Sequence, residues 1–396
     1  MTKPLAGIGV VDLSRILSGP YCTMMLGDMG AEVIKIELPD KGDDTRSWGP
    51  PFVNGESAYF LSINRNKKSL TLDLSSQEGK AILRELICKK DIVVENFRHG
   101  VMERIGFGYE EIQKLNPGIV LCSINGFGQT GPYADRPGYD VMIQAEGGVM
   151  SLTGEPGGLP MKVGVSQADI TAGLLAVNGI LLALRVKEKT GKGQHVDISM
   201  LDGQVGLLTY QAGIYFTTGK NPPRLGSRHP TIAPYEPVKT GDDYIILAVG
   251  NDSLWQKFCK LTGRGELAQD PRFATNAKRV ENHDELMPIV ETILRARGKW
   301  EWLKLLNDAG VPAGDIKSVS EVLTDPHVLA REMVVEMEHP KVGKMKVTGI
   351  PIKLSATPGA IETPPPTLGQ HTDEILMKEL GYSREKIAEL RQKKVV

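Results

Sequence analysis

The residue in this sequence with the clearest chemical potential is an acid, Asp169, at the start of a predicted helix. Ser166 precedes it in the pattern Ser-x-x-Asp, which is typical of a first helical turn, and residues 153–165 before it are rich in glycine. Unpaired N–H groups and the positive end of the helix dipole lie there, so we expect the Asp169 carboxylate to stay ionised. The glycines would let a large ligand approach the backbone. A plain capping role for Asp169 is the alternative that the pattern leaves open.

If the protein forms a covalent intermediate, its nucleophile is expected to be a carboxylate, because the sequence lacks the motifs of serine and cysteine nucleophiles. The sequence has no Gly-x-Ser-x-Gly motif, and no cysteine lies near a conspicuous histidine partner. Its four cysteines and seven histidines are scattered without ligand spacing, so we expect no disulfide framework and no metal site. An acyl-handling enzyme without Ser or Cys chemistry needs a carboxylate nucleophile, and Asp169 is the obvious candidate.

The segment 126–131, Gly-Phe-Gly-Gln-Thr-Gly, has the spacing of a dinucleotide fingerprint. Such a fingerprint opens a helix and is followed by an acid roughly 20 residues later. Here the segment runs into residues 132–137, which begin and end with proline and cannot open that helix. We therefore expect no nicotinamide site, but a loop at the carboxyl end of a parallel strand, where α/β sheets place ligands.

Polar and aromatic residues at the end of another predicted strand are candidates for ligand contact. Asn96 can donate and accept hydrogen bonds, and Phe97 offers a flat surface for a ring. Arg104, just downstream, has the fork geometry that binds a phosphate. A polar turn with a buried Phe97 and a solvated Arg104 is the alternative interpretation.

Two loops carry further candidates. Residues 43–51 contain two acids, Arg46 and Trp48 before a Gly-Pro-Pro stop, which is typical of a substrate lid or an interface. The proline-rich stretch 219–237 holds the one local basic cluster: Arg224, Arg228 and His229. This cluster either holds an acceptor carboxylate or is ordinary surface charge.

The elements that must position these residues alternate between strands and helices. β-rich runs at 8–13, 32–37, 69–74, 91–95, 119–124 and 194–198 alternate with helical patterns at 20–29, 77–89, 109–115, 166–187 and 201–218. In the long helix, Ile170, Leu174, Val177, Leu181 and Leu184 repeat at three- and four-residue steps as an apolar stripe. Repeated β–α–β order predicts an α/β fold with a largely parallel sheet and helices on both faces.

Composition shifts divide the chain into three stretches. Prolines cluster at 222–237 and again at 364–366, which is typical of linkers. Between them, runs at 235–239 and 244–249 predict a hairpin, and helical patterns at 253–261, 282–295 and 299–308 complete a small α+β unit. We expect residues 1–220 to begin a large domain, 221–330 to form the small domain, and 331–396 to return to the large one and complete it with C-terminal helices at 371–380 and 384–393.

Overall composition is that of a globular protein with a sizeable core. Among 396 residues, 47 basic and 48 acidic side chains nearly balance, so we expect neither nucleic acid nor a membrane surface as a partner. The first residues have no apolar core of a signal peptide, and no run resembles a membrane span. These features favour a cytoplasmic location.

In combination, these segments resemble the class III CoA-transferases, a family that includes formyl-CoA transferase, carnitine CoA-transferase and α-methylacyl-CoA racemase. The resemblance covers essentially the full length. Its matching segments are Asp12-Leu-Ser-Arg15, Ser18-Gly-Pro20, Gly30-Ala-Glu-Val-Ile-Lys-Ile-Glu37, Gly42-Asp-Asp-Thr-Arg46, Asn64-Arg-Asn-Lys-Lys-Ser69, Glu95-Asn-Phe97, Asp169, Thr190-Gly-Lys-Gly-Gln194 and Leu368-Gly-Gln-His-Thr-Asp-Glu374. Each segment is weak alone, but their order and spacing together are specific.

The resemblance implies ping-pong transfer of coenzyme A between two carboxylic acids. Asp169, matching the family's catalytic acid, would attack the donor thioester and form an aspartyl anhydride. The released CoA would then form an aspartyl-CoA thioester, from which the acceptor acid takes CoA through a second anhydride. The substrates would be an acyl-CoA and small carboxylic acids, with no metal and no permanently bound cofactor.

By the same resemblance, Asn96, Phe97 and Arg104 would hold CoA, and the Leu72 backbone would contact its adenine. Tyr139 would line the acyl site. Formyl-CoA transferase has a basic residue at the position of Leu38 that meets a CoA phosphate, so Lys41 is expected to substitute for it here.

Departures from the family pattern bear on the acceptor. This chain has Leu17 where formyl-CoA transferase has a substrate-facing glutamine, and residues 225–234 lack its run of glycines. Formate and oxalate are therefore not the expected acids. Arg15, Arg46 and Arg228 point instead to an acceptor with a second carboxylate, such as succinate, and Trp48 would lie near it.

The resemblance also implies an assembly. It predicts a Rossmann-like large domain with a parallel sheet, built from both chain ends, a smaller central α+β domain, and two interlocked subunits forming a homodimer.

Two other functions stay open at this level. An α-methylacyl-CoA racemase needs two acid/base groups on opposite faces of a carbon, and the family's racemases use a Gly-His-Asp segment that here reads Gly138-Tyr-Asp140. A non-catalytic CoA-binding subunit is the second alternative, which retention of Asp169 disfavours.

Overall fold

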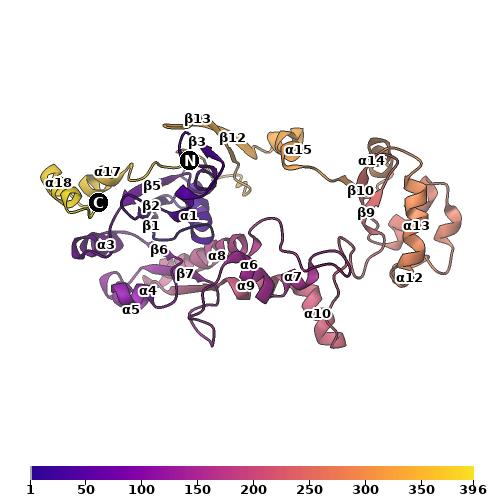
Figure 1. Ribbon diagram of the computed structural model, residues 1–396, viewed down its shortest axis with the longest axis horizontal. Coiled ribbons are helices and arrows are strands. Elements are labelled where there is room, and N and C mark those ends of the chain that lie inside the picture. The colour runs from indigo at the N-terminus through magenta and orange to yellow at the C-terminus, as the bar shows by residue number, and fades with distance from the viewer. Residues whose placement is uncertain (1) are drawn as a thin grey trace. The chain divides into compact units, whose positions relative to one another are not determined.

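The computed structural model describes residues 2–396, and the chain divides into two compact units (Figure 1). Unit 1 contains the chain up to Val149, Lys162–Gly213 and Pro326–Val396, and unit 2 contains Met150–Met161 and Ile214–Asp325. The second segment of unit 2, residues 214–325, lies within a few residues of the expected small domain at 221–330. The first part of the glycine-rich approach to Asp169, residues 150–161, also belongs to unit 2, although the sequence places it inside the large domain.

A six-stranded parallel sheet forms the centre of unit 1. Its strands are β1 (Gly9–Asp12), β2 (Glu32–Glu37), β5 (Lys67–Thr71), β6 (Ile92–Glu95), β7 (Val120–Asn125) and β8 (His195–Ser199). Their order is β5-β2-β1-β6-β7-β8, and every neighbouring pair is parallel. This is the Rossmann-type order, in which the connections run outward in opposite directions from β1 and β6. Ligands of such sheets bind at the carboxyl ends of the two strands where the order reverses.

Helices cover both faces of the sheet, as the alternation of elements predicts (Figure 1). On one face, α1 (Ser18–Asp28) and α8 (Gln167–Thr190) enclose a core that contains Val10, Ile92 and Val94. On the other face, α3 (Gln77–Lys89), α4 (Val101–Ile105) and α5 (Tyr109–Leu115) enclose a core that contains Val11 and Val93. Alternate residues of each strand therefore enter opposite cores, as the two-residue period of a strand requires.

Both chain ends lie in unit 1, but they contribute to it in different ways. All six strands of the sheet come from residues 9–199, so the C-terminal stretch adds no strand to it. The C-terminal stretch instead supplies two helices, α17 (Thr372–Lys378) and α18 (Arg384–Gln392), whose apolar residues enter the second core. It also forms an antiparallel hairpin, β12 (Val334–His339) with β13 (Gly343–Thr348), that the sequence analysis missed.

Short elements complete unit 1. They are the 3-10 helix η1 (Asp44–Ser47), β3 (Phe52–Val53), β4 (Glu56–Ser57), α2 (Ala58–Ile63), α6 (Asp140–Glu146), α9 (Met200–Leu207) and α16 (Pro326–Ala330), with α7 (Val149–Leu152) and α10 (Thr209–Thr218) at the boundaries with unit 2. The helix expected over 201–218 is two helices, because Thr209 has a positive φ of 39° that interrupts it.

Unit 2 is an α+β unit with its own core. The hairpin expected there is confirmed, because β9 (Tyr235–Lys239) and β10 (Tyr244–Ala248) pair antiparallel; β11 (Ala313–Asp315) adds a third strand. The helices are α11 (Asp252–Leu261), η2 (Gly265–Ala268), α12 (Asn276–Glu281), α13 (His283–Leu294), α14 (Lys299–Asp308) and α15 (Val319–Thr324). Fully buried Trp255, Phe258 and Phe273 lie in this core.

Helix α8 has an unusual distribution of side chains. Its buried face consists largely of small residues, with Ala168, Ala172, Ala176 and Ala183 fully buried, while Leu182 is 69% exposed. The predicted apolar stripe therefore does not form one buried face: Val177 and Leu184 are buried, but Leu174 and Leu181 are exposed. Among the described residues, α8 is also the one helix whose length and composition would allow a membrane span. Its position against α1 and the sheet in unit 1 accounts for its buried residues.

Candidate functional site

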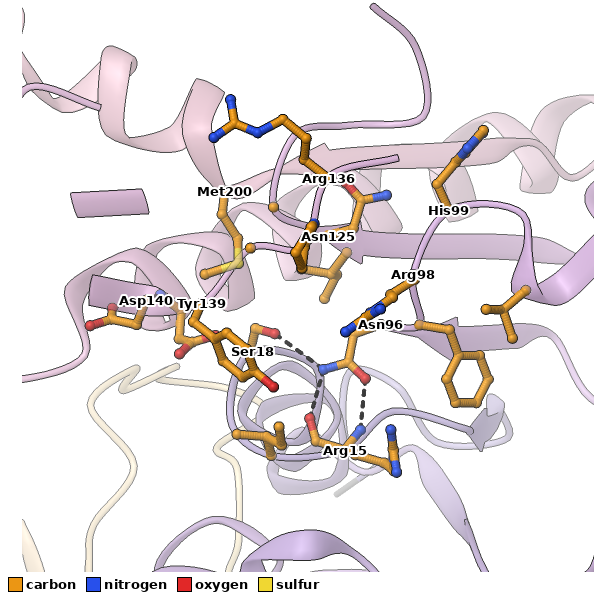
Figure 2. A pocket seen from close by; sticks show the side chains of 18 of the residues that line it. Arg15, Ser18, Asn96, Arg98, His99, Asn125, Arg136, Tyr139, Asp140 and Met200 are labelled. Atoms are coloured by element: carbon orange, nitrogen blue, oxygen red, sulfur yellow. Dashed lines mark hydrogen bonds between the residues drawn. The ribbon is translucent and has the colours of Figure 1, made fainter. Parts of the chain in front are cut away.

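Asp169 lies in the wall of a cavity of about 350 Å³ at the carboxyl ends of β1 and β6. Figure 2 shows this cavity with other residues of its wall labelled. This is the place in the sheet where the strand order reverses. The wall comes from the loop after β1, the loop after β6, the segment after β7 and the first turn of α8. All of these elements belong to unit 1. The volume is within the usual range for small-molecule sites, so the geometry fits a ligand that reaches Asp169.

Close packing of α1 against α8 brings Asp169 to the loop after β1. Gly173 allows this approach, because a Cβ atom there would lie 2.8 Å from the Ser18 carbonyl oxygen. The small residues of the buried α8 face keep the two helices close over their shared length. As a result, the Ser18 side chain at the start of α1 shares the cavity wall with Asp169 and lowers the pKa of its carboxyl group. The alanine-rich face is therefore what positions the candidate nucleophile.

The protonation of Asp169 differs from the sequence-based expectation. Burial, reinforced by the negative charge of Asp140, raises the pKa of Asp169 to about 7, and the Ser18 hydrogen bond opposes the rise only in part. The expectation of a fully ionised carboxylate considered only the helix N-terminus. Desolvation of the charged form outweighs that dipole here, so the carboxylate forms only as the pH rises through neutrality.

The first turn of α8 is capped by an acid from elsewhere in the chain. Ser166 occupies the N-cap position as predicted, but its side chain makes no capping hydrogen bond. Instead, Asp140 Oδ1 accepts hydrogen bonds from the backbone N–H of Ala168 at 2.9 Å and of Asp169 at 3.4 Å. Asp140 therefore satisfies two donors that a helix N-terminus leaves unpaired, and holds its negative charge beside Asp169.

The loop after β1 is held in a strained conformation by side chains around it. Ile16 has a positive φ of 69°, which is rare for a β-branched residue. Asn96 fixes the loop by accepting the Arg15 N–H at 2.8 Å and donating to the Arg15 carbonyl oxygen at 2.6 Å. The buried ammonium of Lys35 donates to the Ser14 carbonyl oxygen and to Asp43, both at 2.8 Å. These contacts stabilise the conformation that places Ser18 beside Asp169.

A buried ion pair lies beneath that loop. Asp12 accepts a hydrogen bond from the Lys67 ammonium at 3.1 Å and also binds the Ser14 and Thr23 hydroxyls. Burial lowers the pKa of Lys67 to about 8, although Asp12 acts in the opposite direction. None of these side chains is exposed, so their contribution is to hold the loop.

The structure brings several predicted site residues together. Asn96, Phe97, Tyr139 and Arg15 all line the cavity with Asp169. Figure 2 shows the hydrogen bonds that join Asn96 to Arg15 and to Ser18. The Asn96 amide is therefore already hydrogen-bonded to the loop after β1. Its effect on a bound ligand would come from positioning that loop.

Other predicted CoA contacts lie outside this cavity. The Leu72 side chain is buried in the core beneath α3, and its N–H donates to the Glu37 carbonyl oxygen at 2.7 Å. Arg104 is exposed on α4. Lys41 lines a separate hollow of about 90 Å³, which shares Arg15 with the main cavity. Their roles in binding CoA stay predictions.

Arg46 and Trp48 do not face the cavity. The Arg46 guanidinium forms a bidentate pair with buried Glu37, at 2.7 Å for both contacts, and stacks 3.7 Å above the Phe60 ring. Its engagement within the protein explains why it is not available to a substrate carboxylate, contrary to the expectation. Trp48 instead packs edge-to-face on Tyr59 at 5.3 Å.

Arg228, the third arginine expected at the acceptor, belongs to unit 2. Its guanidinium lies 3.6 Å from the Asp284 carboxylate, and the Arg228 N–H donates to the Leu225 carbonyl oxygen. Within that unit Arg228 forms a surface ion pair, and its role as a substrate residue stays a prediction.

Several residues around Asp169 were missed by the sequence analysis. Asp140, Arg98, His99, Asn125, Arg136 and Met200 also line the cavity. Asp140 directly follows Tyr139, and Arg98 directly follows Glu95-Asn-Phe97. Their adjacency to predicted site residues was a signal that could have found them. Tyr59 was missed as well; burial, with the charges of Asp169 and Asp140, raises its pKa to about 12.

Behind the cavity, a polar network joins the ends of three strands. Glu95 accepts the Phe97 N–H at 2.8 Å and a hydrogen bond from Ser123, whose hydroxyl lies 2.9 Å from His195 Nε2. Burial raises the pKa of Glu95 to about 7 and lowers that of His195. This network fixes the turn that carries Asn96 and Phe97 into the cavity.

Comparison with protein families gives one match over most of the chain. The model described as CoA-transferase family III matches residues 5–372. The succinyl-CoA:glutarate CoA-transferase of Homo sapiens is 43% identical over 388 residues, covering 98% of this chain and 89% of that protein. The succinate–glutarate CoA-transferase of Agrobacterium fabrum is 45% identical over 379 residues, covering 94% and 95% of the two chains.

A solved structure supports the same relationship. The crystal structure of a CAIB/BAIF family protein from Brucella suis is 43% identical and superimposes with a TM-score of 0.85. The superposition covers 96% of this chain and all of that one. The α/β fold with its parallel sheet is therefore shared over the full length.

Proposed function

This chain belongs to CoA-transferase family III, and we propose that it moves coenzyme A from an acyl-CoA donor to a dicarboxylic acid through covalent intermediates on Asp169. The named CoA-transferases at 43% and 45% identity over nearly the full length make it an enzyme of the CoA-transferase class, which disfavours a non-catalytic subunit. The observation that carries the proposed mechanism is the position of Asp169 in the cavity wall where the strand order reverses.

The proposed reaction has two balanced halves. In the first, an Asp169 oxygen attacks the donor thioester carbonyl, the C–S bond breaks, and the CoA thiolate leaves an aspartyl anhydride. The thiolate then attacks the aspartyl carbonyl, releases the donor acid and forms the aspartyl-CoA thioester. In the second half, the acceptor carboxylate attacks that thioester and forms a new anhydride, from which the thiolate takes the acyl group and regenerates the Asp169 carboxylate.

The residues around Asp169 suit these steps. The attacking group must be ionised, and a pKa near 7 leaves a substantial carboxylate fraction at neutral pH. The Ser18 hydroxyl lies in the same cavity wall and lowers the pKa of Asp169, so it is positioned to stabilise negative charge that develops there. Tyr139 and Met200 line the same cavity and would limit the space for the acyl group.

The acceptor is assigned by class. Both relatives described above are named for transfer between succinate or succinyl-CoA and glutarate. The acids in these names carry two carboxylates. The cavity wall that contains Asp169 also contains several basic side chains, which suit a negatively charged acid. A dicarboxylate of four or five carbons is therefore the acceptor we propose.

A panel of acceptors tests this function. Purified protein is incubated with succinyl-CoA or acetyl-CoA and one acid at a time: succinate, glutarate, oxalate, formate, acetate or propionate. We expect new CoA thioesters of glutarate or succinate, and mass spectrometry identifies the products. Formation of none of these thioesters would refute the proposal. Exchange of an α-hydrogen in deuterated water without any acceptor would support the racemase alternative instead.

We also propose that the functional form is a homodimer in the cytoplasm. The exposed face of α8 supports the dimer, because Leu174, Leu175, Leu181, Leu182 and Val186 are all at least 40% exposed. A large contiguous apolar face is typical of a protein interface. All four cysteines are free thiols, as expected for a reducing compartment. Sedimentation analysis tests the first proposal and cell fractionation tests the second.

A further inference from the structure

The C-terminal segment 368–374, which the structure describes throughout, lies outside the cavity around Asp169. It follows the outer edge of β5, the last strand of the sheet. The His371 N–H donates to the Ser69 carbonyl oxygen at 3.0 Å, and the Ser69 N–H donates to His371 Nδ1 at 3.1 Å. Figure 1 shows α17, which begins in this segment, beside β5. The segment therefore covers a sheet edge whose backbone groups would otherwise lack partners.

The Ser69 hydroxyl connects this segment to a buried carboxylate. The Gly369 N–H donates to Ser69 Oγ at 2.8 Å, and Ser69 Oγ donates to Glu37 Oε1 at 2.7 Å. Because Ser69 accepts from Gly369, its single proton is directed toward Glu37. Ser69 is fully buried, so water does not compete for either contact. The C-terminal segment therefore helps to fix the orientation of the Glu37 carboxylate.

Glu37 is 3% exposed, and four hydrogen bonds occupy the acceptor sites of its carboxylate. Oε1 accepts from Ser69 and from Arg46 Nη2, both at 2.7 Å. Oε2 accepts from Arg46 Nε at 2.7 Å and from the backbone N–H of Asp43 at 3.0 Å. Arg46 Nη2 also donates to the Pro366 carbonyl oxygen at 3.1 Å. Glu37 therefore joins the loop that contains Asp43 to the returning C-terminal chain.

The loop that Glu37 fixes reaches the cavity wall through Asp43. The Asp43 carboxylate accepts the Ile16 N–H at 3.3 Å and pairs with the buried Lys35 ammonium at 2.8 Å. Ile16 has a positive φ, and it lines the cavity together with Ser18. A residue in that conformation needs surrounding contacts that compensate for its strain. Asp43 supplies one of these contacts, and Glu37 holds Asp43 in place.

We propose that Glu37 and Ser69 are positioning residues for catalysis, through which the C-terminal segment holds Ser18 beside Asp169. This role depends on the proposed function, in which Asp169 is the nucleophile. Four contacts connect the segment to the cavity in this order: Gly369 to Ser69, Ser69 to Glu37, Glu37 to Asp43 and Asp43 to Ile16. Loss of one of them would let the loop after β1 relax and carry the Ser18 hydroxyl away from Asp169.

The pH dependence of kcat/KM distinguishes this positioning from a purely structural role. Burial raises the pKa of Asp169 and the Ser18 hydroxyl opposes that rise, so moving the hydroxyl away should shift the pH midpoint upward. A smaller folded fraction would instead lower the rate at every pH and leave the midpoint unchanged. Ser18→Ala sets the scale, and we expect a shift of about 0.5–1 pH unit, the size that one hydrogen-bonding group contributes.

Ser69→Ala removes the hydroxyl between the C-terminal segment and Glu37. We expect its midpoint to rise by at least half of the Ser18→Ala shift, and kcat at high pH to fall by about 2-fold to 15-fold. The double variant of Ser18→Ala with Ser69→Ala should shift no further than Ser18→Ala, because both changes act through the same hydroxyl.

Arg46→Lys tests the same network without altering Ser69. It keeps the positive charge but loses the bidentate contact with Glu37, so its midpoint should rise in the same direction. If Ser69→Ala does not fold, Arg46→Lys replaces it in the comparison with Ser18→Ala. Thermal unfolding at pH 5 and pH 9 checks that each variant is folded at the assay temperature.

Thr71→Val is the matched control. Thr71 lies two residues further along β5, and its hydroxyl is 3.0 Å from the Thr372 hydroxyl, so this substitution also weakens attachment of the C-terminal segment. It leaves the hydrogen bond between Ser69 and Glu37 in place. We expect its pH midpoint to equal that of the wild type, whatever its effect on the unfolding temperature.

Three results would overturn the assignment. They are a wild-type midpoint in Ser69→Ala, equal shifts in Ser69→Ala and Thr71→Val, and a double-variant shift equal to the sum of the two single shifts. Absence of CoA transfer by the wild type, or full activity of Asp169→Asn, would instead refute the proposed function itself.

Discussion

The protonation of one carboxyl group decides when this site can act. Asp169 stands at a helix N-terminus, where a dipole contributes roughly 0.3–1 kcal/mol in favour of the charged form. Burial and the nearby Asp140 charge act against it and raise the pKa to about 7. Since each pKa unit corresponds to about 1.4 kcal/mol, desolvation is the larger effect. Asp169 is therefore a nucleophile whose activity depends on pH near neutrality.

The pH dependence of catalysis follows from that pKa. Because the carboxylate attacks and the acid does not, kcat/KM should rise with pH through about 7 and level off above it. Asp140→Asn keeps an oxygen that can accept the Ala168 N–H but removes the charge, so its midpoint should lie at lower pH. Rates measured from pH 5 to 9 with both proteins test this. An unchanged midpoint in Asp140→Asn would contradict the effect assigned to its charge.

The same pKa predicts an effect on stability. The folded-state pKa of Asp169 lies above the ordinary value of 3.8, so the folded protein holds the proton more tightly than the unfolded chain. Asp169 therefore costs stability increasingly as pH rises from about 4 to 7, by at most roughly 2–4 kcal/mol. Asp169→Asn should unfold at a higher temperature than the wild type at pH 8, with a smaller difference at pH 5. Thermal unfolding at both pH values measures it, and a less stable variant at pH 8 would contradict the account.

At the scale of elements, the site depends on how closely α1 and α8 approach. The alanines and Gly173 on the buried face of α8 leave room for the α1 backbone, which places Ser18 beside Asp169. Asp140 fixes the end of α8 by accepting two of its N–H groups. The loop after β1, where Ile16 has a positive φ, also forms part of this wall, and Asn96 fixes it by accepting a hydrogen bond from the Arg15 N–H. These contacts connect three separate stretches of chain into one rigid wall.

A glycine substitution tests the importance of this helix contact. Gly173→Ala would place a Cβ atom 2.8 Å from the Ser18 carbonyl oxygen, so α1 and α8 must separate. We expect a loss of roughly 1–3 kcal/mol in unfolding free energy, as overpacking predicts, and a fall in kcat. Gly206→Ala in α9 is the control, because a Cβ there meets nothing within 4 Å, and it should be neutral or slightly stabilising. Equal effects of the two substitutions would show that the close approach does not matter.

At the scale of the whole molecule, the sequence alone predicts the framework well. The strand over Glu32–Glu37 and the helices over Gln77–Lys89 and Tyr109–Leu115 form as predicted, because their apolar periods are strong and turn residues bound them. The α/β fold and its parallel sheet follow from the order of these elements. The hairpin β12–β13 was missed, since within residues 331–396 the sequence analysis predicted only a return segment and the C-terminal helices.

The site was predicted less completely than the framework, for physical reasons. Capping of α8 by Asp140 joins residues 28 positions apart, so no local pattern reveals it. The Arg46–Glu37 pair likewise depends on how a loop folds back on β2, and it removes an arginine that the sequence alone leaves available. The unpaired Nδ2 of Asn125 is a property of burial, which composition does not report.

The exposed face of α8 yields a prediction about assembly. Replacing Leu182, which is 69% exposed, by Glu should leave the fold of unit 1 intact, because the side chain is outside the core. We expect the substitution to shift the protein from dimer to monomer, since a charge would be buried unpaired in the interface. Sedimentation velocity measures the mass. Lys304→Glu at the exposed Lys304–Asp308 pair in unit 2 is a control for the added charge, and a dimeric Leu182→Glu protein would contradict the interface.

The central claim is that Asp169 becomes covalently attached to coenzyme A during turnover, and intact-protein mass spectrometry tests it most directly. Protein mixed with succinyl-CoA in the absence of an acceptor should gain the mass of CoA, and peptide mapping should locate the addition at Asp169. Addition of glutarate should remove it, and Asp169→Asn should neither gain the mass nor retain activity, with a loss of at least about 10³-fold. A fully active Asp169→Asn protein, or turnover without any adduct on Asp169, would contradict the account.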